Sequence, residues 1–272
     1  MLYFKRLPTA ALALLPLAVS ATAFAATQSD QLVVTATRMA QTIDQSLVPV
    51  SVLTREDIDQ SPATSLPELL SQLPGVDFSV SGGYGQSSNL YLRGTNSSHT
   101  LVLIDGIKIG SATLGSAPFE NISLHQVERI EVVRGPRSSL YGSEAIGGVI
   151  QIFTRKPNEG VTASAKVGAG NHGTQELSAG VGLGSEQGSL AINMSHSKTD
   201  GIDAQPSGNA DKDGYKSNSA SINLHLNMTD ATKAEITLLR TAATNQFDRS
   251  PAAYDDYSDI MQQSLGARIS SD

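Results

Sequence analysis

Residues 134–155 constrain the fold more than any other part of the chain, and they read RGPRSSLYGSEAIGGVIQIFTR. Glycine tolerates positive φ and close backbone contact, so the stretch predicts tight turns at Gly135, Gly142, Gly147 and Gly148. The β-branched and aromatic residues that follow favour a half-buried strand over 149–154. Taken alone, this pattern is compatible with a loop and strand of any globular domain.

The first 25 residues have the three parts of a secretory signal peptide. Residues 5–6 are basic, residues 10–19 are apolar, and Ala23-Phe24-Ala25 is a small-x-small cleavage site. A membrane-spanning helix needs about 20 apolar residues, and Pro8 and Pro16 interrupt this stretch. We therefore expect a signal peptide over 1–25, export of the mature chain, and no transmembrane helix.

The composition excludes several classes of function. The net charge is −7, which argues against a nucleic-acid partner because phosphate binding needs clustered Lys and Arg. The chain has no Cys, so it has no disulfide and no thiolate metal site. Its five histidines are scattered and form no catalytic constellation. We expect neither enzymatic activity nor a redox cofactor.

Residues 41–156 show a mixed α and β pattern. A strand is predicted over 50–53, followed by a helix start at Thr54 with Asp57 three residues later. Ser65 and Glu68 predict a capping box, and the helix that follows has one apolar face, made by Leu66, Leu69, Leu70 and Leu73. Pro74-Gly75 is expected to end that helix. Further strands are predicted over 89–93, 101–104 and 130–134, with a hairpin turn at Asp105-Gly106.

Beyond Pro157 the hydrophobic period changes to two. Apolar and polar residues alternate over 177–183, 190–194 and 219–228. The links at 184–188 and 229–230 are short, whereas 198–214 is predicted to be a long polar loop. This pattern is typical of a transmembrane β-barrel, although a soluble β-sandwich alternates in a similar way. About 115 residues remain after 156, enough for roughly six strands of about 10 residues.

Together these motifs resemble the TonB-dependent outer-membrane receptors, and residues 134–155 resemble the end of their plug domain. The resemblance implies an α+β plug domain over 41–156, followed over 157–272 by the first strands of an antiparallel transmembrane β-barrel. Such receptors close about 22 strands, and lipid does not tolerate an open sheet edge. We therefore expect this chain to be the N-terminal portion of a receptor.

The resemblance also assigns a partner-binding segment within the N-terminal extension, residues 26–40. It places the TonB box, which would bind the periplasmic energy-coupling protein TonB, at Asp30, Gln31, Leu32, Val33, Val34, Thr35 and Ala36. A mobile extended strand of this kind can pair by main-chain hydrogen bonds with a strand edge on its partner. The alternative is that these residues are simply the first strand of the domain that follows.

Within the family, Arg93-Gly94-Thr95-Asn96-Ser97-Ser98-His99 and the strand 101–106 most resemble the cobalamin transporters, over 31–154 and more weakly beyond. That likeness implies cobalamin or a related corrinoid as substrate, bound at Ser87, Asn89, Asn96, Leu114 and Gly115. Asn96 also fits a purely structural role as the cap of a turn. A siderophore receptor of the same family, or a plug fragment that transports nothing, are the alternative functions.

Acidic residues crowd the segment 200–214, read TDGIDAQPSGNADKDG from Thr199. Hard oxygen ligands suit Ca²⁺, and the resemblance implies a calcium site at Asp203, Asp211 and Asp213, with Asn245 or Asp248 as a candidate from a second loop. The alternative is a solvated acidic loop.

The resemblance gives Arg93 and Arg134 a structural role. In the family, arginines at these places pair with acidic residues of the barrel wall and hold the plug inside it. We expect those wall residues to lie beyond Asp272.

Overall fold

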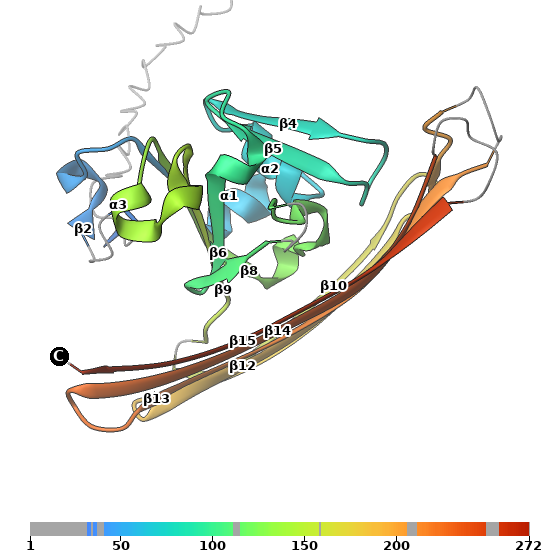
Figure 1. Ribbon diagram of the computed structural model, residues 1–272. Coiled ribbons are helices and arrows are strands. Elements are labelled where there is room, and N and C mark those ends of the chain that lie inside the picture. The colour runs from blue at the N-terminus through green and yellow to red at the C-terminus, as the bar shows by residue number, and fades with distance from the viewer. Residues whose placement is uncertain are drawn as a thin grey trace, which may run out of the picture.

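The computed structural model describes residues 32–33, 35–36, 41–110, 115–157, 159–205, 211–248 and 256–271. It has two layers: a mixed α/β plug lies on the concave face of a long curved sheet (Figure 1). The predicted signal peptide lies outside the described residues. No helix in the described part of the chain is both long and apolar enough to cross a membrane.

The plug is built on a five-stranded sheet with the order β3-β8-β9-β6-β7. All neighbours are antiparallel except β6 and β9. The strands are β3 (Val50–Leu53), β6 (Thr100–Ile104), β7 (Ile107–Ile109), β8 (Val127–Arg134) and β9 (Gly148–Thr154). Two small antiparallel pairs accompany it, β1 (Leu32–Val33) with β2 (Gln41–Thr42) and β4 (Val76–Val80) with β5 (Ser88–Leu92). The strand predicted over 149–154 and the hairpin at Asp105-Gly106 are confirmed, with φ +48° and +82° at the two turn residues.

Three short α-helices lie around this sheet: α1 (Arg55–Gln60), α2 (Leu66–Ser71) and α3 (Ser138–Tyr141). The 3₁₀ turns are η2 (Ile43–Gln45), η3 (Ser97–His99), η4 (Phe119–Asn121), η5 (Leu124–Gln126) and η6 (Ser143–Ala145). Thr54 and Asp57 form a reciprocal capping box at α1, as predicted.

Only one of the two hydrogen bonds of the capping box predicted at α2 is present. Ser65 caps Glu68 N–H, but the Glu68 carboxylate accepts from Thr64 N–H, one residue earlier, at 2.8 Å. The helix also ends at Ser71 rather than at Pro74-Gly75, because the last turn closes with Gln72 N–H donating to Leu69 C=O.

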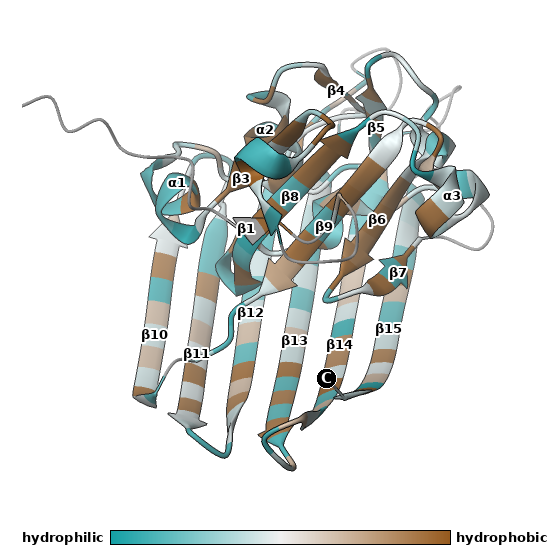
Figure 2. Ribbon diagram, turned by 90° about the vertical axis from the view of Figure 1, so that its left-hand side faces the viewer, coloured by the Kyte–Doolittle hydropathy of each residue, from teal (hydrophilic) through white to brown (hydrophobic). Residues whose placement is uncertain are grey.

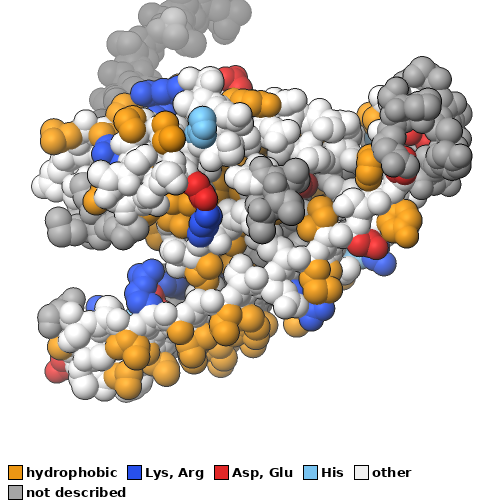
Figure 3. Space-filling view, in the orientation of Figure 1, with side chains coloured by type: hydrophobic (Ala, Val, Ile, Leu, Met, Phe, Trp, Pro, Cys, Tyr) orange, Lys and Arg blue, Asp and Glu red, His pale blue; other side chains and the backbone are white. Residues whose placement is uncertain are grey.

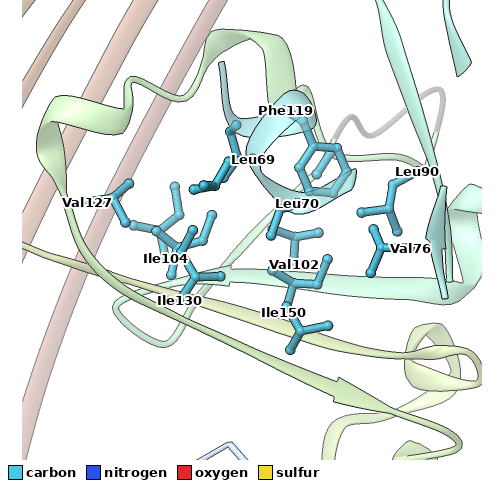
Figure 4. Packing of buried hydrophobic residues seen from close by; sticks show 14 of the residues in the cluster. Leu69, Leu70, Val76, Leu90, Val102, Ile104, Phe119, Val127, Ile130 and Ile150 are labelled. Carbon is cyan, nitrogen blue, oxygen red and sulfur yellow. The ribbon is translucent and has the colours of Figure 1, made fainter. Parts of the chain in front are cut away.

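The apolar face predicted for α2 forms the centre of the plug core (Figure 4). Leu66, Leu69 and Leu70 are buried against strands of the sheet. Phe119 is buried beside them, and its ring meets Phe78 edge-on with centroids 5.4 Å apart. The buried residues of this core all come from the plug, and Leu239 of the curved sheet packs against them, so the plug has a hydrophobic interior of its own.

The curved sheet has six antiparallel strands in sequence order, β10 (Gly160–Ala169), β11 (Gln175–Ser185), β12 (Gly188–Ile202), β13 (Asp213–Asn227), β14 (Thr232–Phe247) and β15 (Asp256–Ser271). The number of strands predicted after the plug is confirmed. The prediction of a long loop over 198–214 was wrong at both of its boundaries. Strand β12 continues to Ile202 and strand β13 begins at Asp213, so the connection between them is shorter than predicted. Main-chain pairing of Thr199 with Tyr215 and of Ile202 with Asp213 takes up the extra residues around a bulge.

Polarity alternates along every strand of this sheet, as the bands in Figure 2 show. The apolar side chains point away from the plug: Ile222 and Leu226 are exposed, whereas Ser221 and Asn223 on either side of Ile222 are buried. Figure 3 shows these hydrophobic side chains gathered along the outer surface of the sheet. An apolar outside and a polar inside is the arrangement of a lipid-facing barrel wall, the reverse of a soluble sandwich.

Candidate functional site

A cleft of about 930 Å³ lies between the plug and one end of the curved sheet. The plug contributes Gln86, Ser87, Ser88 and Glu120 to its walls, and the sheet contributes Asp213, Asn245, Phe247 and Asp248. Its ionisable lining residues, among those the structure describes, are all acidic: Glu120, Asp213 and Asp248. The cleft therefore presents hydroxyl, amide and carboxylate groups, and it favours a neutral or cationic ligand rich in hydrogen-bonding groups.

The loop between β4 and β5 forms one wall of the cleft and is fixed to the sheet at three points. Asn245 Nδ2 donates to Gly85 C=O at 2.9 Å, and Gln86 Nε2 donates to Gln246 C=O at 2.7 Å. Gly85 also lies against the ring of Tyr215: a Cβ built on this glycine would lie 2.1 Å from the ring. Sequence reasoning missed Gly85, Gln86 and Tyr215, and it reached Asn245 only as a calcium candidate, because each contact joins residues far apart in the chain.

Tyr215 is held in place by the plug on its other side. Its hydroxyl donates to Asn121 Oδ1 at 3.0 Å, and its ring meets Tyr84 edge-on with centroids 5.8 Å apart. The β4–β5 loop, the turn η4 and the strand β13 therefore all meet at Tyr215. We expect a change in any of the three to displace this wall of the cleft.

Glu120 is one of the plug residues that line the cleft. Ser88 Oγ donates to its Oε2 at 2.8 Å. Burial raises the pKa of Glu120, and the hydrogen bonds from Ser88 oppose that rise. A ligand cation or N–H donor that reaches this carboxylate would replace some of the lost solvation.

The predicted ligand residues are divided between the cleft and other places. Ser87 lines the cleft. Asn89 lies on β5 opposite Ser79, and Asn96 caps η3 by accepting from Ser98 N–H at 3.5 Å; neither lines the cleft. Gly115 has φ +67° and lies next to Ser98, while Leu114 lies outside the described residues. The ligand role of these residues stays a prediction.

Of the residues predicted for the calcium site, Asp213, Asn245 and Asp248 line the cleft. Asp213 Oδ2 accepts from Ala204 N–H at 2.8 Å, and Gln205 N–H lies within reach of both Asp203 Oδ1 (3.2 Å) and Asp248 Oδ2 (3.0 Å). Asp248 Oδ1 is buried and has no hydrogen-bond partner among the described residues. In the ranges that the structure describes, no three acidic or histidine side chains are grouped closely enough to hold a metal ion. The calcium site, with Asp211, stays a prediction.

The two arginines predicted to hold the plug lie close together, but neither forms an ion pair with another described residue. Arg134 is buried at the end of β8 and donates from Nη2 to Ser51 Oγ at 2.9 Å. Burial lowers the pKa of Arg134, and the nearby charge of Arg93 lowers it further. The wall residues expected to pair with them stay a prediction.

The described part of the predicted TonB box is docked on the plug. Leu32 and Val33 pair with Thr42 and Gln41, and the side chains of Val33, Thr35 and Ala36 are buried. Asp30, Gln31 and Val34 lie outside the described residues. Leu32 and Val33 thus take the extended form expected of the segment, whereas Thr35 and Ala36 lie in a turn, and these described residues are held against the plug.

His125 on η5 makes the stability of the plug depend on pH. Burial lowers the pKa of His125 to about 4, and the charges of Arg155 and Arg55 reinforce the shift. Between the ordinary pKa of 6.5 and about 4 the unfolded chain binds the proton and the folded chain does not, so stability falls as pH falls through this window. We expect H125Q to flatten the loss of the urea midpoint between pH 7 and pH 5. An unchanged slope would assign the loss to other groups.

Comparisons with known proteins agree with this architecture. Residues 42–149 match the family model described as TonB-dependent Receptor Plug Domain. The chain is 49% identical over 158 residues to "Vitamin B12 transporter BtuB" of Photobacterium profundum, covering 57% of this chain and 26% of that protein. It is 42% identical over 163 residues to the protein of the same name from Vibrio cholerae, covering 58% of this chain and 26% of that protein. The match thus spans about a quarter (26%) of the length of these curated relatives.

Among solved structures, the ferric enterobactin receptor PfeA of Pseudomonas aeruginosa superposes with a TM-score of 0.69 at 21% identity. The superposition covers 89% of this chain and 40% of that chain. At this level of identity the likeness shows the fold alone. It confirms the predicted fold class: a plug domain followed by the first strands of an antiparallel barrel.

Proposed function

We infer that this chain, which belongs to the TonB-dependent receptor family of the outer membrane, acts in the uptake of cobalamin or a related corrinoid. The ligand would bind from outside in the cleft between plug and wall. TonB would then act on residues 30–36 from the periplasm and use inner-membrane energy to open a path past the plug. In this role the protein changes no covalent bond of its cargo.

The similarity to vitamin B12 transporters over the plug is the observation that carries this proposal. The charge of the cleft supports it. A corrinoid such as cyanocobalamin is neutral overall and carries many peripheral amides, which match the Ser, Gln and Asn groups on the walls. A ferric tris-catecholate is an anion, and Glu120, Asp213 and Asp248 would repel it. The cleft thus favours a corrinoid over the siderophore alternative.

Direct binding of both ligand classes tests this proposal. We expect the protein in detergent to bind cyanocobalamin in isothermal titration calorimetry, and to bind ferric enterobactin at least tenfold more weakly, as expected for about 1.4 kcal/mol of discrimination. Removal of calcium with EGTA is expected to weaken cobalamin binding, because Asp203, Asp211 and Asp213 would then repel one another. Preferential binding of the ferric chelate would overturn the corrinoid assignment and favour the siderophore receptor. Equal affinities with EGTA and with calcium would remove the calcium proposal alone.

A further inference from the structure

We propose that Glu131 and Tyr141 form a latch on the main chain of Thr35 and thereby set how often the TonB-binding segment becomes available to its partner. The inference rests on the proposed role of residues 30–36 as that segment. Glu131 and Tyr141 act here as positioning residues, because they hold the segment and touch no ligand.

The latch holds both main-chain hydrogen-bonding groups of one residue. Thr35 N–H donates to Glu131 Oε2 at 2.9 Å, and Thr35 C=O accepts from the Tyr141 hydroxyl at 3.0 Å. Thr35 is 2% exposed, and Val33, two residues before it, is 0% exposed. Because the contacts are made to the backbone, the latch does not depend on the side chain at position 35.

The chemistry of Glu131 points to a purpose beyond packing. It lies in the middle of β8 and its side chain is 0% exposed, on the face of the strand opposite to Ile130 and Val132. A buried carboxylate is costly unless it is paired and hydrogen-bonded. Its Oε1 lies 2.9 Å from Arg129 Nη2, and the Arg129 guanidinium lies over the Phe153 ring at 4.3 Å. Arg129 thus orients the carboxylate through Oε1, which leaves Oε2 as an acceptor for the Thr35 N–H.

The position of the Tyr141 side chain is also fixed by its packing. It ends α3, and its ring packs against the small apolar cluster of Leu101, Leu103, Ala145 and Val149. Figure 1 shows α3 and β2 at one end of the plug, opposite the loop of the β4–β5 hairpin that borders the cleft. The latch therefore lies on the side of the plug away from the ligand cleft.

The contacts compete directly with partner binding. A strand that adds to a partner's sheet uses its main-chain N–H and C=O groups. In the docked state both groups of Thr35 are already occupied, and Leu32 and Val33 pair with β2. Docking and partner binding are therefore mutually exclusive at this segment, so weakening the latch should raise the population that the partner can bind.

Cysteine accessibility tests the latch without any ligand. The chain contains no Cys, so V33C introduces a single reporter thiol at a fully buried position. Its reaction with a maleimide would be followed in outer membranes from cells that lack TonB. We expect Y141F to raise the rate roughly threefold and E131Q to raise it about tenfold, in line with the loss of one neutral and one charge-assisted hydrogen bond.

Matched variants separate the latch from general loosening. E128Q changes an exposed carboxylate on the same strand and Y91F removes a hydroxyl on β5, and neither should change the V33C rate. L47C, at a fully exposed position, reports access of the reagent, and V102C reports the core. Rates for E131Q and Y141F within twofold of the parent would overturn the latch. So would a parallel rise at V102C, since that indicates unfolding of the plug.

Capture of the partner completes the test. Without ligand, E131Q should retain more of a purified TonB C-terminal domain than the parent does. If V33C becomes reactive and capture stays unchanged, the latch holds and the proposed partner-binding role of the segment fails. Loss of cobalamin binding would affect neither readout, so it would count only against the substrate assignment.

Discussion

Deletion of residues 32–36 is expected to abolish uptake and to leave ligand binding within about twofold of the parent, since the cleft and the segment share no contact. The described lining of the cleft comes from residues 81–120 and 204–262. The segment contacts β2, Glu131 and Tyr141 on another side of the plug. Uptake should therefore fall to the background of a strain that lacks TonB, while calorimetric titration with cyanocobalamin stays the same.

Single substitutions at Val33 show whether the main chain is what the partner uses. Proline at this position removes the N–H that a paired strand donates, so V33P should lose nearly all uptake. V33A keeps the N–H and should retain most of it. The mechanism is wrong if V33P cells take up labelled cobalamin as fast as V33A cells. Weakened cobalamin binding in the deletion variant would instead show that the segment contributes to the ligand site.

Features defined by neighbouring residues were predictable from the sequence. The turn at Asp105-Gly106 follows from two residues that tolerate positive φ between apolar runs, and both have positive φ. The buried face of α2 follows from Leu66, Leu69 and Leu70 at helical spacing. In each case the determining interactions lie within one turn of the chain.

The direction in which the curved sheet faces needed more than periodicity. The alternation around Ile222 indicates which residues share a face, but it does not say which face is buried. The structure buries Ser221 and Asn223 because they lie toward the plug, where Asn223 Nδ2 donates to Thr154 Oγ1 at 2.8 Å. Only the resemblance of the plug to a known family supplied that orientation beforehand.

The contacts that shape the candidate sites were beyond sequence reasoning. Thr35 meets Glu131 across 96 residues, and Asn245 meets Gly85 across 160. In the sequence, Glu131 is an ordinary polar position of a strand, and its burial becomes visible only in the folded plug, where β8 is a central strand paired with β3 and β9. For the same reason Gly85 reads as a loop glycine, although a ring from the sheet occupies the place of its side chain.

Because Gly85 lies against the Tyr215 ring, we expect G85A to weaken cobalamin binding tenfold or more, corresponding to about 1.4 kcal/mol. A Cβ at position 85 would lie 2.1 Å from the Tyr215 ring, and that ring is fixed by Asn121 and Tyr84. The loop must therefore lift from the sheet and lose the bonds from Asn245 and Gln86, worth about 0.5–1.5 kcal/mol each. Gln86 and Ser87 would leave the cleft wall with it.

Backbone strain alone does not account for this effect, and G160A controls for it. Gly160 also has positive φ (+92°), but apart from its chain neighbours no atom of a described residue lies within 4 Å of the Cβ that alanine would add. G160A should therefore bind cobalamin as the parent does.

A double-mutant cycle with Tyr215 tests the contact itself. In a Y215A background the ring is gone, so G85A should weaken binding less there than in the parent, which is a positive coupling in the cycle. Protease cleavage within 81–87 should rise for G85A and not for G160A, which gives a readout independent of the ligand. Parent-like binding and protection of G85A would mean that Tyr215 does not fix this loop, and the cleft wall would then have to be held by the Asn245 and Gln86 hydrogen bonds alone.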